Sequence, residues 1–193
     1  MTKTLTRLYN TYDHASKTVV ALKAHGFTDS EISLVGPAAA ETTSAAGADA
    51  GTGAEAGGVL GAGVGLLTGL GLIAIPGVGP VVAAGWLAAT IAGAVVGAAA
   101  GAVTGGIVGA LTGDGMTVAD ANVYAEGVRR GGTLLTVRTA DDREAEAQRI
   151  LDDHMPVDMA ARGAEYRSEG WDGFDPKAPP YVAPRGGTPM PPL

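Results

Sequence analysis

Side chains that could perform chemistry are few in this sequence and lie far apart. The three histidines, His14, His25 and His154, are scattered, and cysteine is absent, which excludes thiolate metal ligands and thiol nucleophiles. His154 closes the stretch "DDH" (from Asp152) at the end of a predicted helix, where a histidine interacts with terminal carbonyls. His14 beside Asp13 is typical of a solvated helical turn. Because spaced ligands and a Ser-His-Asp or paired-carboxylate pattern are missing, we predict no metal site and no catalytic residues.

Two further patterns bear on ligand binding. "GLGLIA" (Gly69 to Ala74) fits the glycine spacing of a dinucleotide-binding turn, but no predicted strand precedes it and no acidic ribose partner follows. Arg129 and Arg130 form a basic pair that could touch lipid phosphates, although two adjacent charges usually mark a solvated helix end. We therefore expect no cofactor and no enzymatic activity, and the sequence points to no known small-molecule ligand.

The distribution of charge is more informative than any motif. The 193-residue chain has a formal net charge of −7 and no run of Lys or Arg, so we expect no nucleic-acid partner. Residues 56–113 contain no Asp, Glu, Lys, Arg or His. So long an uncharged stretch predicts either a membrane-inserted segment or an unusually buried core. The first residues lack the apolar run of a secretory signal, which favours the cytoplasm or the cytoplasmic face of the inner membrane.

Glycine recurs at every fourth position through this uncharged stretch. Two apolar segments, 57–75 and 81–111, flank a turn signal that comprises Pro76, Gly77, Gly79 and Pro80. We predict that both segments are helices, about 28 and 46 Å long, whose small-residue stripes pack together as in pairs of membrane helices. The stripe residues are Gly57, Gly61, Gly65 and Gly69 in the first arm and Gly85, Gly93, Gly97, Gly101, Gly105, Gly109 and Gly113 in the second.

Three interpretations of this glycine-ladder hairpin are compatible with the sequence. The hairpin can insert into a bilayer, and an even number of spans would keep both flanks on one side. It can instead be buried between the subunits of a soluble oligomer, or the repeat can be an accident of Gly/Ala-rich composition. The nearest flanking charges, Glu55 and Asp114, are both acidic and do not decide the orientation.

The charged flanks predict one small α+β domain that the uncharged stretch interrupts. Apolar periodicity predicts strands at 5–10, 31–35, 133–139 and 157–163 and helices after Asn10, after Thr117 and over 141–154. Asn10 is the expected cap of the first helix, and His25 with Gly26 its end. Without the uncharged stretch and the short helix after Thr117, the order is strand-helix-strand twice. That is the ferredoxin-like split βαβ-βαβ pattern, an antiparallel sheet with two helices on one face.

A division of the chain follows from these elements. Residues 1–37 and 114–166 are the two halves of the ferredoxin-like domain, 38–56 is an Ala/Gly-rich linker, 57–113 is the helical hairpin, and 167–193 is a proline-rich tail. In the tail, Trp171, Phe174 and Tyr181 are candidate anchors that would pack on the chain's own domain or on a neighbouring subunit. The alternative is an extended, disordered tail.

Packing motifs in both flanks are similar to those of a known group. "TLTRLYNTYDHASKTVVALKAHGFTDSEISLVG" resembles the opening module of the bacterial general stress protein domain, of the heat-induced stress protein type. "VYAEGVRRGGTLLTVRT" and "EAQRILDDHMPVDM" resemble its second half, so the resemblance covers residues 4–170. It implies a domain that carries a Gly-rich central segment and is induced by stress, and it implies no activity and no functional residue.

Together these features predict a non-enzymatic, self-associating, stress-type protein. The hairpin would anchor it to a membrane or to lipid, and the α+β domain would remain in the cytoplasm. One alternative is a soluble self-assembling scaffold or shell whose hairpins pack between subunits or enclose apolar cargo. Another is a small-ligand sensor. The expected partners are further copies of the chain and lipid.

Overall fold

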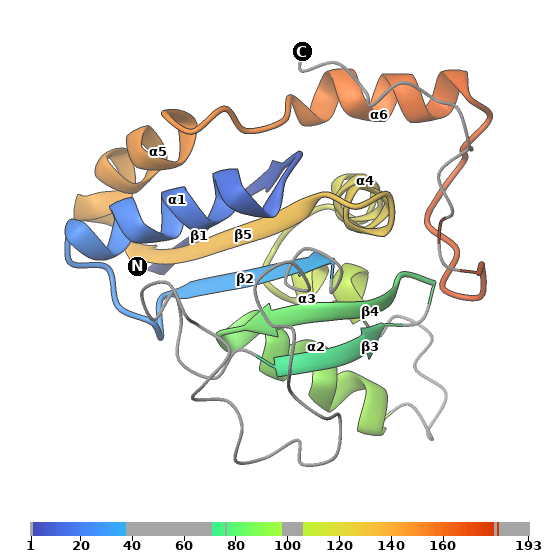
Figure 1. Cartoon of the computed structure of the whole chain (residues 1–193), viewed down its shortest axis with the longest axis horizontal. Helices are drawn as coiled ribbons and strands as arrows, with labels where there is room; N and C mark the ends of the chain where they lie inside the picture. Colours follow the sequence, from blue (N-terminus) through green and yellow to red (C-terminus); the bar gives the residue numbers. More distant parts are fainter. Residues whose placement is uncertain (1, 38–70, 76, 98–105, 180, 182–193) are drawn as a thin grey trace.

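The computed structural model describes residues 2–37, 71–75, 77–97, 106–179 and 181. Over these residues the chain forms a five-stranded antiparallel sheet with helices on both faces (Figure 1), so it is mixed α+β, as predicted. The elements are strands β1 (Thr2–Tyr9), β2 (Ile32–Pro37), β3 (Gly71–Ile75), β4 (Gly79–Ala84) and β5 (Thr133–Ala140), helices α1 (Tyr12–Ala24), α2 (Trp86–Gly97), α3 (Gly106–Gly113), α4 (Val118–Arg129), α5 (Glu144–Asp152) and α6 (Met159–Ser168), and a 3-10 turn (Asp141–Arg143).

The strand order is β1-β5-β2-β4-β3, and every neighbouring pair is antiparallel (Figure 1). β5 pairs with β1 over their whole length and with β2 on its other side. These three strands come from the charged flanks, and they lie side by side in the order β1-β5-β2. β4 and β3 then extend the sheet beyond β2, so the uncharged stretch contributes two strands to the domain of its flanks.

The predicted fourth strand at 157–163 is wrong. Asp158 instead begins α6, because its carboxylate accepts hydrogen bonds from the backbone N–H groups of Ala160 and Ala161 at 2.9 and 3.0 Å. An Asp cap followed by Met and Ala favours a helix over the apolar alternation of this segment. Val157 does meet the sheet edge, where its N–H donates to the carbonyl of Leu8 at 2.7 Å. The ferredoxin-like pattern is therefore not completed.

Alternate residues of the central strands point to two separate cores. On one face, Tyr9, Leu34 and Leu135 pack with the apolar sides of α1 and α5. On the other, Leu8, Val35 and Leu134 pack with α2, α3 and α4. In the predicted ferredoxin-like pattern, helices cover only one face of the sheet. In the structure, the short helix α4 and the helices of the uncharged stretch cover the second face as well. The result is a three-layer domain.

The predicted helical hairpin is wrong over residues 71–75 and 81–84, which are strands. β3 and β4 pair antiparallel, with Ile75 opposite Gly79, and the Val78 N–H donates to the Ile75 carbonyl at 3.0 Å. A turn does lie within the predicted segment, at Gly77 and Val78, and Gly77 and Gly79 have positive φ. Gly79 and Pro80 already belong to β4, and Pro76 lies outside the described residues. Short apolar runs such as "GLIAI" and "PVVAA" fit a buried strand as well as a helix, which is why periodicity did not separate the two.

The predicted long second helix is also interrupted. Gly85, at φ +84°, separates β4 from α2. This position requires glycine, because an added Cβ would lie 2.2 Å from the carbonyl oxygen of Ile32. α2 and α3 are separate helices that contact each other. The stripe residues on them are Gly93 and Gly97 on α2 and Gly109 and Gly113 on α3. The stripe residues outside the described part of the chain are Gly57, Gly61, Gly65, Gly69, Gly101 and Gly105.

Local capping signals account for the helices of the flanks. Thr117 caps α4 as predicted, since its hydroxyl accepts from the Asp120 N–H at 3.1 Å. α1 is capped by Thr11, one residue later than predicted, and ends at His25 before Gly26. The predicted cap, Asn10, instead accepts a hydrogen bond from a buried arginine, Arg162 of α6, at 3.0 Å.

Candidate functional site

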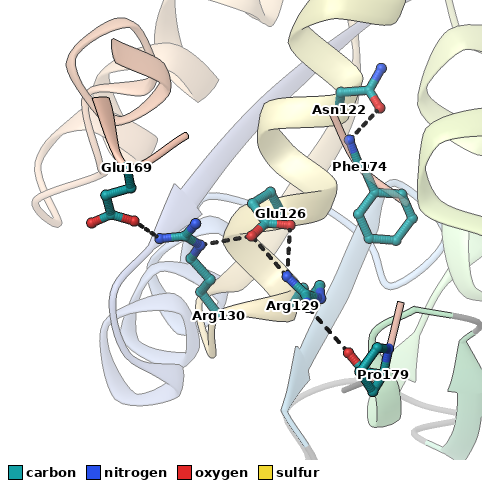
Figure 2. A network of polar contacts seen from close by, with 7 residues as sticks. All are labelled: Asn122, Glu126, Arg129, Arg130, Glu169, Phe174 and Pro179. Atoms are coloured by element: carbon teal, nitrogen blue, oxygen red, sulfur yellow. Dashed lines mark hydrogen bonds and ion pairs between the residues drawn. The ribbon is translucent and has the colours of Figure 1, made fainter. Parts of the chain in front are cut away.

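A buried glutamate near the end of α4 holds two arginines. The Glu126 side chain is only 1% exposed, and its carboxylate accepts from Arg129 Nη1 at 3.0 and 3.3 Å and from Arg130 Nε at 2.7 Å (Figure 2). Spacings of three and four residues place all three side chains on one side of the helix. Each guanidinium is thereby fixed in position at the end of α4, since a carboxylate bound by two arginines leaves both with little freedom.

Arg130 extends this network to the segment after α6. Its guanidinium pairs with Glu169 (Figure 2) and lies 4.1 Å from the ring centroid of Tyr166, a cation–π contact. Burial lowers the pKa of Arg130, but hydrogen bonds to Glu169 and Glu126 raise it more, so the pKa lies above its ordinary value. Burial raises the pKa of Tyr166 to about 12. At neutral pH the arginine is charged and the phenol is neutral.

The C-terminal tail lies across the same network. The Phe174 N–H donates to Asn122 Oδ1 at 3.1 Å, and Arg129 Nη2 donates to the carbonyl of Pro179 at 3.1 Å (Figure 2). The Tyr181 ring centroid lies 5.7 Å from the Arg129 guanidinium carbon and 5.3 Å from that of Arg130. Backbone hydrogen bonds and cation–π contacts therefore both attach the tail to α4.

The first part of the tail packs on α6 and on the β3–β4 turn. The Trp171 ring meets that of Tyr166 edge to face, with centroids 5.8 Å apart, and the backbone N–H of Trp171 donates to the Tyr166 carbonyl at 3.0 Å. Gly77, at φ +77°, lies so close that an added Cβ would be 2.6 Å from the Asp175 carbonyl oxygen. All three candidate anchors, Trp171, Phe174 and Tyr181, thus contact the chain's own domain.

The histidines occupy helix ends, as their positions in the sequence indicate. A ring nitrogen of His25 lies 2.9 Å from the carbonyl oxygen of Ala21, and one of His154 lies 3.0 Å from that of Ile150. Among the described residues no group of three or more His, Cys, Asp or Glu side chains is arranged to hold a metal ion. His25 and His154 thus contact backbone carbonyls near the ends of α1 and α5.

The prediction of a solvated arginine pair at the end of α4 is wrong. Arg129 and Arg130 are only 17% and 15% exposed, and both are ion-paired. Their sequence spacing from Glu126 was a sign of this pairing, but the partners on the tail are 39 and 50 residues away, at Glu169 and Pro179. Local sequence patterns do not report contacts of that separation.

Comparisons with known proteins identify no relative: no family model, no curated protein and no solved structure matches this chain. The resemblance of the flanks to the general stress protein domain therefore stays a prediction.

Proposed function

We propose that this protein is non-catalytic and self-associating, and that its copies join through the uncharged end of the sheet formed by β3 and α2. The observation that carries this proposal is the contrast between the two edges of the sheet. Edge strands present unpaired backbone groups, and proteins protect such edges with charges or by covering them.

The β1 edge has this protection. Lys3 pairs with Glu144, and Arg7 Nε pairs with Asp152 Oδ1 at 2.8 Å. Charged side chains thus lie along this edge of the sheet. A second copy approaching β1 would have to displace these ion pairs and bury their charges, which is costly.

Within the part of the chain that the structure describes, the β3 edge carries no charge. β3 reads Gly-Leu-Ile-Ala-Ile, and Leu72 is 68% exposed, the most exposed of the large apolar side chains in the described part of the chain. α2 follows β4 in the sequence. It buries Leu87 and Ile91 and exposes Ala89 and Thr90, and it too is uncharged. An uncharged edge strand is the surface that most readily pairs with another chain, and the uncharged helix α2 packs against the neighbouring strands β2 and β4.

The occupant we propose for this edge is the β3 strand of a second copy. Two identical strands related by a twofold axis run antiparallel, as their neighbours in the sheet do, and no like charges meet. Lipid is a poorer occupant, because acyl chains cannot accept hydrogen bonds from the backbone N–H groups of an open sheet edge. The stress-type role that the flanks suggest is compatible with such an assembly, but it identifies no residue of the interface.

Membrane association is the second candidate, and it rests on the absence of charge over residues 56–113. Within the described ranges, no helix is both long and apolar enough to cross a bilayer.

The test is the mass of the full chain in detergent-free buffer, measured by analytical ultracentrifugation for wild type, Leu72→Lys and Val20→Lys. Val20 is 46% exposed on α1, on the opposite face of the sheet, and serves as the matched control for adding one lysine. We expect a defined oligomer for wild type and Val20→Lys and a smaller species for Leu72→Lys. An equal mass for all three proteins would contradict the β3 interface, and recovery only in detergent would favour the membrane.

A further inference from the structure

We propose that a cavity beneath Tyr181 binds a small carboxylate with an apolar chain. The cavity has a volume of about 240 Å³ and lies where the end of β2, the start of β4 and the end of α4 meet. At about 30 Å³ per water molecule, it has room for about eight non-hydrogen atoms. It is therefore smaller than the usual pocket for a drug-sized ligand, which limits the ligand to a short chain.

One side of the cavity is apolar. Val78, Val81 and Val128 line it, and all three side chains belong to the buried core beneath α4. Pro37 and Pro80 also line it, and neither proline has a backbone N–H to offer a ligand. A hydrocarbon chain placed against this wall loses contact with water and gives up no hydrogen bond.

The other side presents guanidinium groups. Arg129 and Arg130 line the cavity, so two positively charged groups lie beside it. Guanidinium and carboxylate groups match in geometry and charge, which selects a carboxylate over a neutral oxygen.

The charge balance of the network identifies the group that such a ligand displaces. Two arginines are balanced by two glutamates, so a further carboxylate has to compete for a guanidinium. Glu126 is buried and bonded to both arginines, whereas the Glu169 side chain is 48% exposed and, among the described residues, pairs with Arg130 alone. Glu169 is therefore the exchangeable partner. The ring of Tyr181, which rests over both guanidiniums, covers the cavity.

The probe is hexanoate, whose eight non-hydrogen atoms fill the estimated space. Hexanoate is added to the full chain up to about 20 mM, which is the Kd expected for an eight-atom ligand of ordinary efficiency. The methyl resonances of Val78, Val81 and Val128 are followed by NMR during the titration. Acetate supplies the carboxylate without the chain, and hexanol supplies the chain without the charge. We expect hexanoate to shift these methyl resonances at concentrations at least fivefold lower than either control. Unmoved methyl resonances, or equal effects of hexanol, would overturn the proposal.

Two variants separate the site from non-specific binding. Glu169→Gln removes the competing carboxylate, and since an exposed ion pair is weak, hexanoate should bind about twofold to fivefold more tightly. A misfolded protein would not show this gain. Tyr181→Ala removes the cover and should weaken binding, whereas Tyr181→Phe, which keeps the ring, should retain it. Unchanged or weaker binding to Glu169→Gln would refute the exchange of partners, and with it the proposed site.

Discussion

Replacing Glu126 with glutamine tests the network that joins α4 to the tail. The substitution preserves size and one acceptor oxygen but removes the negative charge that two arginines share. Glu126 is 1% exposed and accepts three hydrogen bonds from Arg129 and Arg130, so the variant leaves two largely buried guanidiniums without their common partner.

The expected cost follows from the burial of the partners. Breaking a buried ion pair by removing one member costs about 3–5 kcal/mol. Arg129 and Arg130 retain 17% and 15% exposure, and Arg130 keeps its pair with Glu169, so we expect the lower end, about 3 kcal/mol. For a chain of this length, that corresponds to a fall in Tm of about 6–12 °C.

The assay is urea unfolding followed by far-UV circular dichroism, with Glu146→Gln as the matched control. Glu146 pairs with Arg143 at the same three-residue spacing, but both side chains are about one-third exposed, so the control should cost less than about 1 kcal/mol. Limited proteolysis should also cut the tail of Glu126→Gln faster than that of wild type. Equal destabilisation by the two substitutions would refute the claim that burial of Glu126 gives the network its strength.

Three further predictions concern single positions. Gly85→Ala should destabilise the fold by more than about 3 kcal/mol in urea unfolding, because φ is +84° and the new Cβ would lie 2.2 Å from the Ile32 carbonyl oxygen. Asp158→Ala removes the cap of α6 and should lower stability by about 1 kcal/mol, measured as a fall in Tm of about 2–4 °C. Burial raises the pKa of Tyr9 to about 12, above the value of about 10 in the unfolded chain. The buried neutral phenol therefore contributes to stability below pH ~10, and this contribution is lost as the pH rises through 12. Tyr9→Phe loses the hydrogen bond to the Leu151 carbonyl but should lose less stability than wild type between pH 9 and 11.5.

The elements that local signals define were predictable from the sequence. Thr117 and the residues after it mark the start of α4, and Gly26 marks the end of α1, because cap and stop residues act within one helical turn. β5 was recognisable as a run of β-branched and apolar residues that follows Gly131 and Gly132. These signals depend on neighbours in sequence, and the tertiary structure agrees with them.

The elements built from the uncharged stretch were not predictable in the same way. Over residues 71–84 nearly every side chain is apolar or glycine, so neither the helical period nor the strand period stands out. Pairing with β2 decides in favour of strands, since Leu34 opposite Ala84 and Val35 opposite Ala83 extend an existing sheet. The tail site depends similarly on contacts between residues far apart in sequence, which periodicity does not encode.

Hydrogen exchange in β3, measured by mass spectrometry at several protein concentrations, tests the central claim most directly. If copies join through β3, a peptide covering Gly71–Ile75 should exchange more slowly as the concentration rises, while peptides from α1 remain unchanged. The same peptide of Leu72→Lys should exchange rapidly at every concentration. Exchange in β3 that does not depend on concentration, in a protein that is nonetheless oligomeric, would place the interface elsewhere and contradict the account.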